Sequence, residues 1–177
     1  MNNQNNQKKD KIVIYKPYLK STLCMKVSLL ITEIGNNIEK NLEQKIVHKI
    51  EGKCIADGYI RPKSVSIKTH SAGSISSKYI NYHVSFDCMV CTPVEGMLLE
   101  AVVKTITKAG IHAEVVDEEN EQTNIPITVF VSRDLNTDKN FNDVKEKNKI
   151  TVKVIGSRYE LNDPTICVIA KLINNNY

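Results

Sequence analysis

A run of strand-forming residues that begins after Gly96 and turns back at Gly110 constrains the fold of this 177-residue chain more than any other feature. Valine, leucine, isoleucine and threonine dominate the run, and the apolar pattern resumes at Ile111. A strand, a glycine turn and a returning strand predict the start of a small β-barrel. Because the run lies in mid-chain, another folded unit must occupy the first half.

The second half continues this pattern through further extended segments. Strands are predicted near residues 97–106, 111–117, 126–132, 149–156 and 165–172. Five strands with one longer connection between the third and the fourth fit an OB barrel, a fold that commonly serves as a binding module. A parallel sheet would need long helices between its strands, and the sequence pattern shows none.

The first half combines one helix with alternating strands. An apolar stripe at i, i+4 spacing predicts the helix: Ile38, Leu42, Ile46 and Ile50. Asn36 is the expected N-cap, Glu39 completes a capping box, and Gly52 is expected just past the helix end. The segments Leu23–Leu29 and Tyr82–Val90 alternate in the way that is typical of half-buried strands.

The sequence therefore predicts an α+β protein of two domains. Residues 11–93 are expected to form a small α/β domain of the RNP-like type, with a helix on an antiparallel sheet. Residues 94–173 are expected to form a five-stranded OB-fold β-barrel. The polar residues 1–10 and 174–177 are expected to be disordered tails.

Composition limits the function classes. The net charge is +4, and nearly all the positive charge is lysine, with arginine only at positions 61, 133 and 158. Base-specific readout is not expected, because lysine lacks the forked donors of arginine. An odd number of cysteines without an apolar leader argues against a secreted disulfide scaffold. No apolar run reaches the ~20 residues of a membrane span, so an intracellular protein is expected.

No catalytic residue, metal site or cofactor is predicted. Cys88 and Cys91 have CxxC spacing, but zinc would need a second ligand pair, and residues three apart on a strand point to opposite faces. They are interpreted as small buried residues, with a zinc or redox role as the alternative. The histidines stand in no recognisable relation to a nucleophile, and the acidic cluster 117–121 is typical of a solvated hairpin tip.

Two segments are candidates for binding. After the turn at Asp57, Tyr59 either packs inward within a hairpin or belongs to a protruding tip that docks on a partner. In the barrel, basic residues could hold a phosphate backbone, and Phe130 is either a stacking ring or a core residue. The candidate RNA-binding residues are Lys104, Lys108, His112, Phe130, Arg133 and Lys153.

Taken in order, these segments resemble the stalk subunit of multisubunit DNA-directed RNA polymerases, namely the seventh subunit of eukaryotic RNA polymerase II and its archaeal equivalent. The resemblance covers residues 23–171. Its most specific parts are three short motifs: Glu51-Gly52, Gly58-Tyr59-Ile60 and Glu95-Gly96. The bias toward asparagine, lysine and isoleucine suits a version encoded by a large DNA virus.

This resemblance implies a noncatalytic subunit that acts in transcription. The N-terminal domain would dock at the clamp base, on the large subunits and a small core subunit, with Gly58, Tyr59 and Ile60 as the docking tip. The barrel would bind nascent RNA, and a small helical stalk partner could accompany the chain. The location would follow the polymerase, in the nucleus or in virion and host cytoplasm. A free-standing OB-fold RNA-binding protein of translation-factor type is the alternative.

Overall fold

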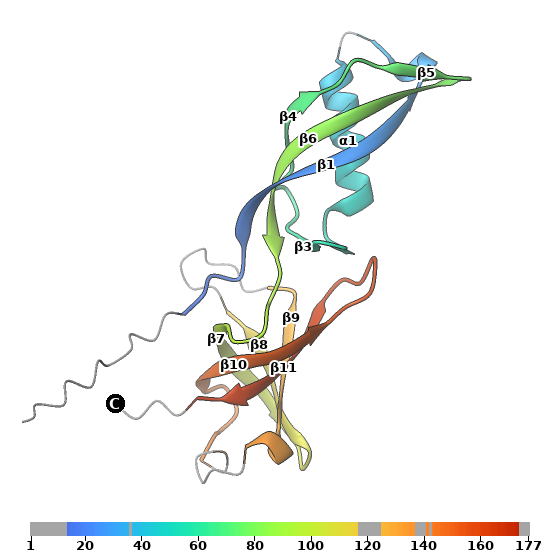
Figure 1. The fold of residues 1–177 in the computed structure, drawn as a ribbon. Coiled ribbons are helices and arrows are strands. Elements are labelled where there is room, and N and C mark those ends of the chain that lie inside the picture. The colour runs from blue at the N-terminus through green and yellow to red at the C-terminus, as the bar shows by residue number, and fades with distance from the viewer. Residues whose placement is uncertain (1–13, 36, 117–124, 137–140, 142, 174–177) are drawn as a thin grey trace, which may run out of the picture.

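The computed structural model describes residues 14–35, 37–116, 125–136, 141 and 143–173. Its elements form an N-terminal module, a sheet with one α-helix, followed by a closed C-terminal barrel (Figure 1). The predicted tails, the Asn36 N-cap and the acidic cluster lie outside the described residues. The division at residues 93 and 94 stays a prediction, although the last strand of the sheet ends at Cys91 and the barrel begins at Leu98.

The sheet is built around one long strand, β6 (Tyr79–Cys91). Along one edge β6 pairs antiparallel with β1 (Leu19–Leu30) over the full length of β1. Its other edge pairs in turn with three short strands: β5 (Ser74–Ser76), β4 (Ser66–His70) and β3 (Gly58–Ile60). β3 also pairs with β2 (Cys54–Ile55). Both predicted alternating strands are confirmed, and each is longer than expected.

One face of this sheet is covered by α1 (Ile38–Ile50), which buries the predicted apolar stripe. Leu42, Ile46 and Ile50 are at most 1% exposed and share a core with Phe86 of β6. No other α-helix among the described residues covers the sheet, so its second face is open (Figure 1). No helix in the described ranges is long and apolar enough to span a membrane. The helix on an antiparallel sheet is as predicted, whereas the RNP-like classification stays a prediction.

Glu51 connects the end of the helix to the turn that follows β3. Its carboxylate accepts hydrogen bonds from the backbone N–H groups of Lys63 (2.8 Å), Ser64 (3.1 Å) and Val65 (3.1 Å). Next to it, the N–H of Gly52 donates to the carbonyl of Ile60 at 2.9 Å. The Glu51-Gly52 motif is therefore structural. It accepts hydrogen bonds from backbone N–H groups of a turn that would otherwise lack partners.

The second half forms a closed five-stranded barrel in the order β7-β8-β9-β11-β10. The strands are β7 (Leu98–Ile106), β8 (Gly110–Val115), β9 (Ile127–Ser132), β10 (Lys149–Arg158) and β11 (Ile166–Leu172). β9 and β11 run parallel, and the other neighbours are antiparallel. This is the Greek-key arrangement of an OB barrel, so the predicted barrel is confirmed. A Cβ at Gly110 would overlap the carbonyl of Val131, so the returning strand requires glycine there.

A shared core joins the N-terminal module to the barrel. Tyr18, Cys54, Tyr59 and Cys91 are buried in the same cluster as the barrel interior. Backbone hydrogen bonds of 2.9 Å run from the N–H of Cys54 to the carbonyl of Asp163, and from the N–H of Asn162 to the carbonyl of Cys54. Because β2 thus pairs with the β10–β11 connection, the two parts are held in one orientation.

Candidate functional site

The segment Gly58-Tyr59-Ile60 packs inward as strand β3. Tyr59 is 8% exposed and Ile60 is fully buried, and burial raises the pKa of the Tyr59 hydroxyl. Gly58 has a φ of 127°, and a Cβ there would overlap the hydroxyl of Thr92. The inward alternative for Tyr59 is therefore correct, and the geometry of a protruding tip is wrong. The docking role of these three residues stays a prediction. They would support docking indirectly, by holding the β2–β3 hairpin in place.

Cys88 and Cys91 point into different cores. Cys88 packs with the sheet and helix, whereas Cys91 packs with the barrel cluster, and each is at most 1% exposed. Burial raises the pKa of both thiols, that of Cys91 to about 12, so neither supplies a thiolate near neutral pH. Within the described ranges, no three His, Cys, Asp or Glu residues gather as metal ligands would. This placement agrees with the interpretation of the pair as small buried residues.

Phe130 lies on the outside of the barrel. Its neighbours Val129 and Val131 are fully buried, so the alternation of β9 turns the Phe130 ring outward. His112 stands opposite on β8, with ring centroids 4.9 Å apart and an interplanar angle of 47°. The core alternative for Phe130 is therefore wrong. The two rings together form a surface on which a base could stack.

Three predicted basic residues lie on the strands and turns around this ring pair. The Lys104 ammonium is 2.8 Å from the carboxylate of Glu114. Lys108 is exposed in the turn between β7 and β8. Arg133 directly follows β9 and places its guanidinium 5.0 Å from the ring centroid of Phe141. Two of these cations are thus partly engaged within the chain, which leaves Lys108 as the more available one.

Lys153 does not belong to this surface, whereas Ile169, which was not predicted, does. Lys153 lies on β10 opposite Leu98, with the whole of β7 between it and β8. Ile169 of β11 stands beside Phe130 in the parallel register and is 49% exposed. The alternation of β11, in which Val168 is buried, was the signal that could have identified Ile169 as outward-facing.

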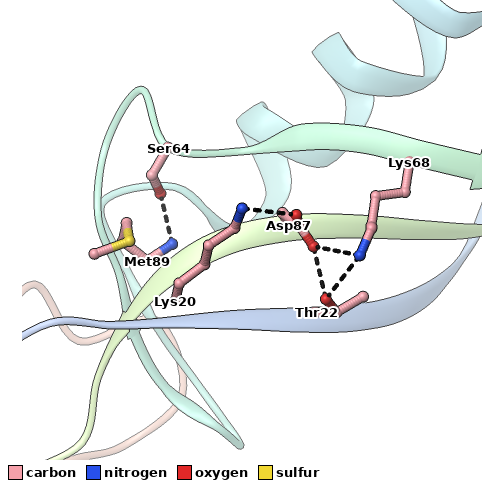
Figure 2. Close-up of polar contacts among 6 residues, drawn as sticks. All are labelled: Lys20, Thr22, Ser64, Lys68, Asp87 and Met89. Atoms are coloured by element: carbon pink, nitrogen blue, oxygen red, sulfur yellow. Dashed lines mark hydrogen bonds and ion pairs between the residues drawn. The ribbon is translucent and has the colours of Figure 1, made fainter.

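A second polar site lies on the open face of the N-terminal sheet, around Asp87 (Figure 2). The Thr22 hydroxyl donates to the Asp87 carboxylate at 2.6 Å, and the ammonium groups of Lys20 and Lys68 lie 3.2 and 3.3 Å away. The Thr22 hydrogen bond, together with the two lysines, lowers the pKa of Asp87 to about 2. Sequence reasoning singled out none of these residues, because they come from three different strands.

The β5 end of the sheet lies far from the barrel (Figure 1). Apolar side chains are exposed at this end. Ile75 of β5 is 75% exposed and Tyr79 of β6 is 41% exposed. They belong to the tight hairpin in which Ser74, Ile75 and Ser76 pair with Asn81, Ile80 and Tyr79. Because Ile75 stands opposite Ile80 and Tyr79 opposite Ser76, the two side chains lie on opposite faces of the hairpin, and a partner that covered both would have to enclose its end.

Comparison with known proteins finds this chain similar to RNA polymerase subunits, although no family model matches it. A protein of Acanthamoeba polyphaga mimivirus named as DNA-directed RNA polymerase subunit L376 is 26% identical over 174 residues, which cover 89% of this chain and 82% of that protein. DNA-directed RNA polymerase II subunit 7 of Arabidopsis thaliana is 30% identical over 103 residues, or 57% of this chain. Subunit RPB7 of Glycine max is 29% identical over an equal length.

The two plant matches cover 53% of each plant protein, so the chain spans about half the length of those relatives. The mimivirus match, in contrast, runs through both the sheet and the barrel. The plant relatives confirm the resemblance to the seventh polymerase subunit, and the mimivirus relative is named as a polymerase subunit of a virus.

Proposed function

We propose that this chain, as a relative of the seventh polymerase subunit, is the noncatalytic stalk subunit of a DNA-directed RNA polymerase. The observation that supports this most is a match to a viral polymerase subunit over 89% of the chain. Catalysis would belong to the large subunits. The protein would be found inside the cell with its polymerase, in the nucleus or in virion and host cytoplasm.

The N-terminal module would dock on the polymerase core at the clamp base, against the large subunits and a small core subunit. The apolar end of the β5–β6 hairpin supports this placement, because Ile75 and Tyr79 are exposed there. The Gly58-Tyr59-Ile60 segment would act indirectly, by holding the module on the barrel. Burying apolar side chains of this size against the core would remove their surface from water, and this would favour binding.

The barrel would offer its outer surface to nascent RNA. The His112–Phe130 ring pair, with Ile169 beside it, provides one position at which a base could stack. Lys108 and Arg133 lie at the same end of the barrel, since the N–H of Arg133 donates to the carbonyl of Ala109 at 3.0 Å. They would contact the phosphate backbone.

The test of this function is association with the polymerase. An affinity-tagged chain, purified from cells that carry the whole polymerase, is expected to bring down the large subunits in stoichiometric amounts. Mass spectrometry of the same sample would identify a small helical stalk partner if one is present. Recovery of the chain without large subunits would overturn the proposal and favour the free-standing OB-fold RNA-binding protein.

Replacing Phe130 by alanine is expected to weaken binding of single-stranded RNA about tenfold, because base stacking contributes roughly 1–3 kcal/mol per base. The dependence of affinity on salt should not change, since no phosphate contact is lost. Fluorescence anisotropy over a series of KCl concentrations measures both quantities. The matched control is Phe130→Tyr, which keeps the ring and should retain affinity. Full affinity in Phe130→Ala would show that RNA does not stack on this surface.

A further inference from the structure

The positive charge of the chain is concentrated in the half that precedes the barrel. Residues 1–93 contain 14 lysines and arginines against 7 aspartates and glutamates, whereas residues 94–177 contain 10 against 13. The two halves therefore differ in sign, at +7 and −3. A polyanion is attracted to the first half over a distance of about a Debye length, and the barrel as a whole opposes it.

Three of the lysines stand on the open face of the N-terminal sheet. Lys20 and Lys26 belong to β1, where they lie opposite Met89 and His83 of β6. Lys68 belongs to β4 and reaches the same face, because its ammonium contacts Asp87 (Figure 2). Since α1 covers the opposite face, all three ammonium groups face solvent on one side of the module.

Asp87 holds two of these lysines without neutralising them. A single carboxylate lies between Lys20 and Lys68, so one negative charge is shared by two positive charges. The side chain of Asp87 is only 17% exposed, whereas those of Lys20 and Lys68 are 72% and 52% exposed. The ammonium groups are thus fixed at the surface with donors still available. Ammonium groups of this kind can donate charge-assisted hydrogen bonds to phosphate oxygens.

The rest of this face suits a phosphate backbone better than it suits bases. RNA-binding sheets that read bases place aromatic rings on their central strands. The outward positions of the central strand β6 are Tyr79, Asn81, His83, Ser85, Asp87 and Met89. Tyr79 stands at the far end of the strand, opposite Leu30 of β1, so the stretch around Asp87 presents one imidazole and no Phe, Tyr or Trp ring. Hydroxyl groups, such as that of Ser85, can donate to phosphate but do not distinguish sequences.

We propose that the open face of the N-terminal sheet is a phosphate-backbone contact for single-stranded RNA that works without base recognition. Lys20, Lys26 and Lys68 are the cationic contacts, and Asp87 is the carboxylate that competes with phosphate for Lys20 and Lys68. The proposal rests on the proposed function only in naming the polyanion as RNA. Under this proposal the sheet and the barrel contact RNA in different ways. The sheet contributes positive charge, and the barrel contributes one position for base stacking.

The full chain with Lys20→Ala, Lys26→Ala and Lys68→Ala is compared with the unmodified chain for binding to an oligouridine and to a mixed-sequence RNA. The slope of log affinity against log KCl is expected to fall by about 2, since each phosphate contact to a single strand contributes about 0.7. Both RNAs should lose affinity equally. The matched control changes three lysines of α1, Lys40, Lys45 and Lys49, and should keep the slope. If the control lowered the slope equally, the effect would depend on net charge alone and not on this face, and the proposal would be overturned.

Asp87→Asn provides a second test, in which RNA affinity is expected to rise and not to fall. If the face binds phosphate, removal of the carboxylate should raise RNA affinity, whereas a purely structural Asp87 would leave it unchanged or lower. An unchanged salt slope in the triple lysine variant would overturn the proposal even if the chain still co-purified with the polymerase. Loss of polymerase association with RNA binding intact would assign the face to a protein partner instead, and this too would overturn the proposal.

Discussion

Replacement of both Ile75 and Tyr79 by glutamate is expected to abolish co-purification of the polymerase large subunits while leaving the chain folded. Both side chains are exposed, so the free chain bears little cost when they become charged. In the docked complex the two carboxylates would be buried without partners, at a cost of several kcal/mol each. Affinity for the core should therefore fall by a factor of roughly 100 or more.

The measurement is a quantitative pull-down with the tagged variant, together with circular dichroism to show that the fold is kept. The matched control is Leu161→Glu, which charges a 70% exposed leucine in the connection between the two barrel strands β10 and β11. That variant should bind the core normally. Stoichiometric recovery of the large subunits with the double glutamate variant would show that the β5–β6 end is not the docking surface.

Replacement of Tyr59 by alanine is expected to lower the free energy of unfolding by about 3 kcal/mol or more. The ring is 8% exposed within the cluster that the sheet module shares with the barrel, so its removal leaves a cavity where the two parts meet. Urea denaturation should show a lower transition midpoint, and a second transition if the two parts begin to unfold separately.

The control for this variant is Tyr59→Phe, which keeps the ring and should change stability by less than about 1.5 kcal/mol. A direct docking contact makes a different prediction. Under that hypothesis, Tyr59→Ala would lose binding to the polymerase core with no loss of stability. That result would show that Tyr59 acts as a docking contact and not through its buried packing in the junction.

Several parts of the fold could be predicted because they depend on local patterns. The five barrel strands and α1 were predicted within about two residues, since hydrophobic periodicity and glycine turns act through neighbouring backbone groups. The strands β1 and β6 were predicted too short at both ends. Ser21 breaks the apolar series between Leu19 and Leu23 in β1, and the aromatic Tyr79 stands at an outward position of β6, so both interrupt the alternation on which the prediction relied.

The errors concern segments in which several adjacent residues are apolar. Val129, Phe130 and Val131 all have side chains that could be buried, so alternation alone could not say which faced inward. The same ambiguity affected Tyr59, whose environment is completed by residues about a hundred positions later, where Asn162 and Asp163 bond to β2. The burial of such segments is decided by what packs on them, and packing partners leave no mark in the local sequence.

The sequence by itself determined that this chain is a helix-and-sheet unit followed by a five-stranded barrel, with motifs that resemble a polymerase stalk subunit. Only the tertiary structure decided which residues lie together at the surface and which are buried. It buried Tyr59 in the junction, turned the partly buried Phe130 to the outside of the barrel, and brought Lys20, Lys68 and Asp87 together on one face. The physical reason is that secondary structure follows local periodicity, whereas a surface is made by side chains from strands far apart in the chain. Thr22 and Asp87, for example, are bonded across 65 residues.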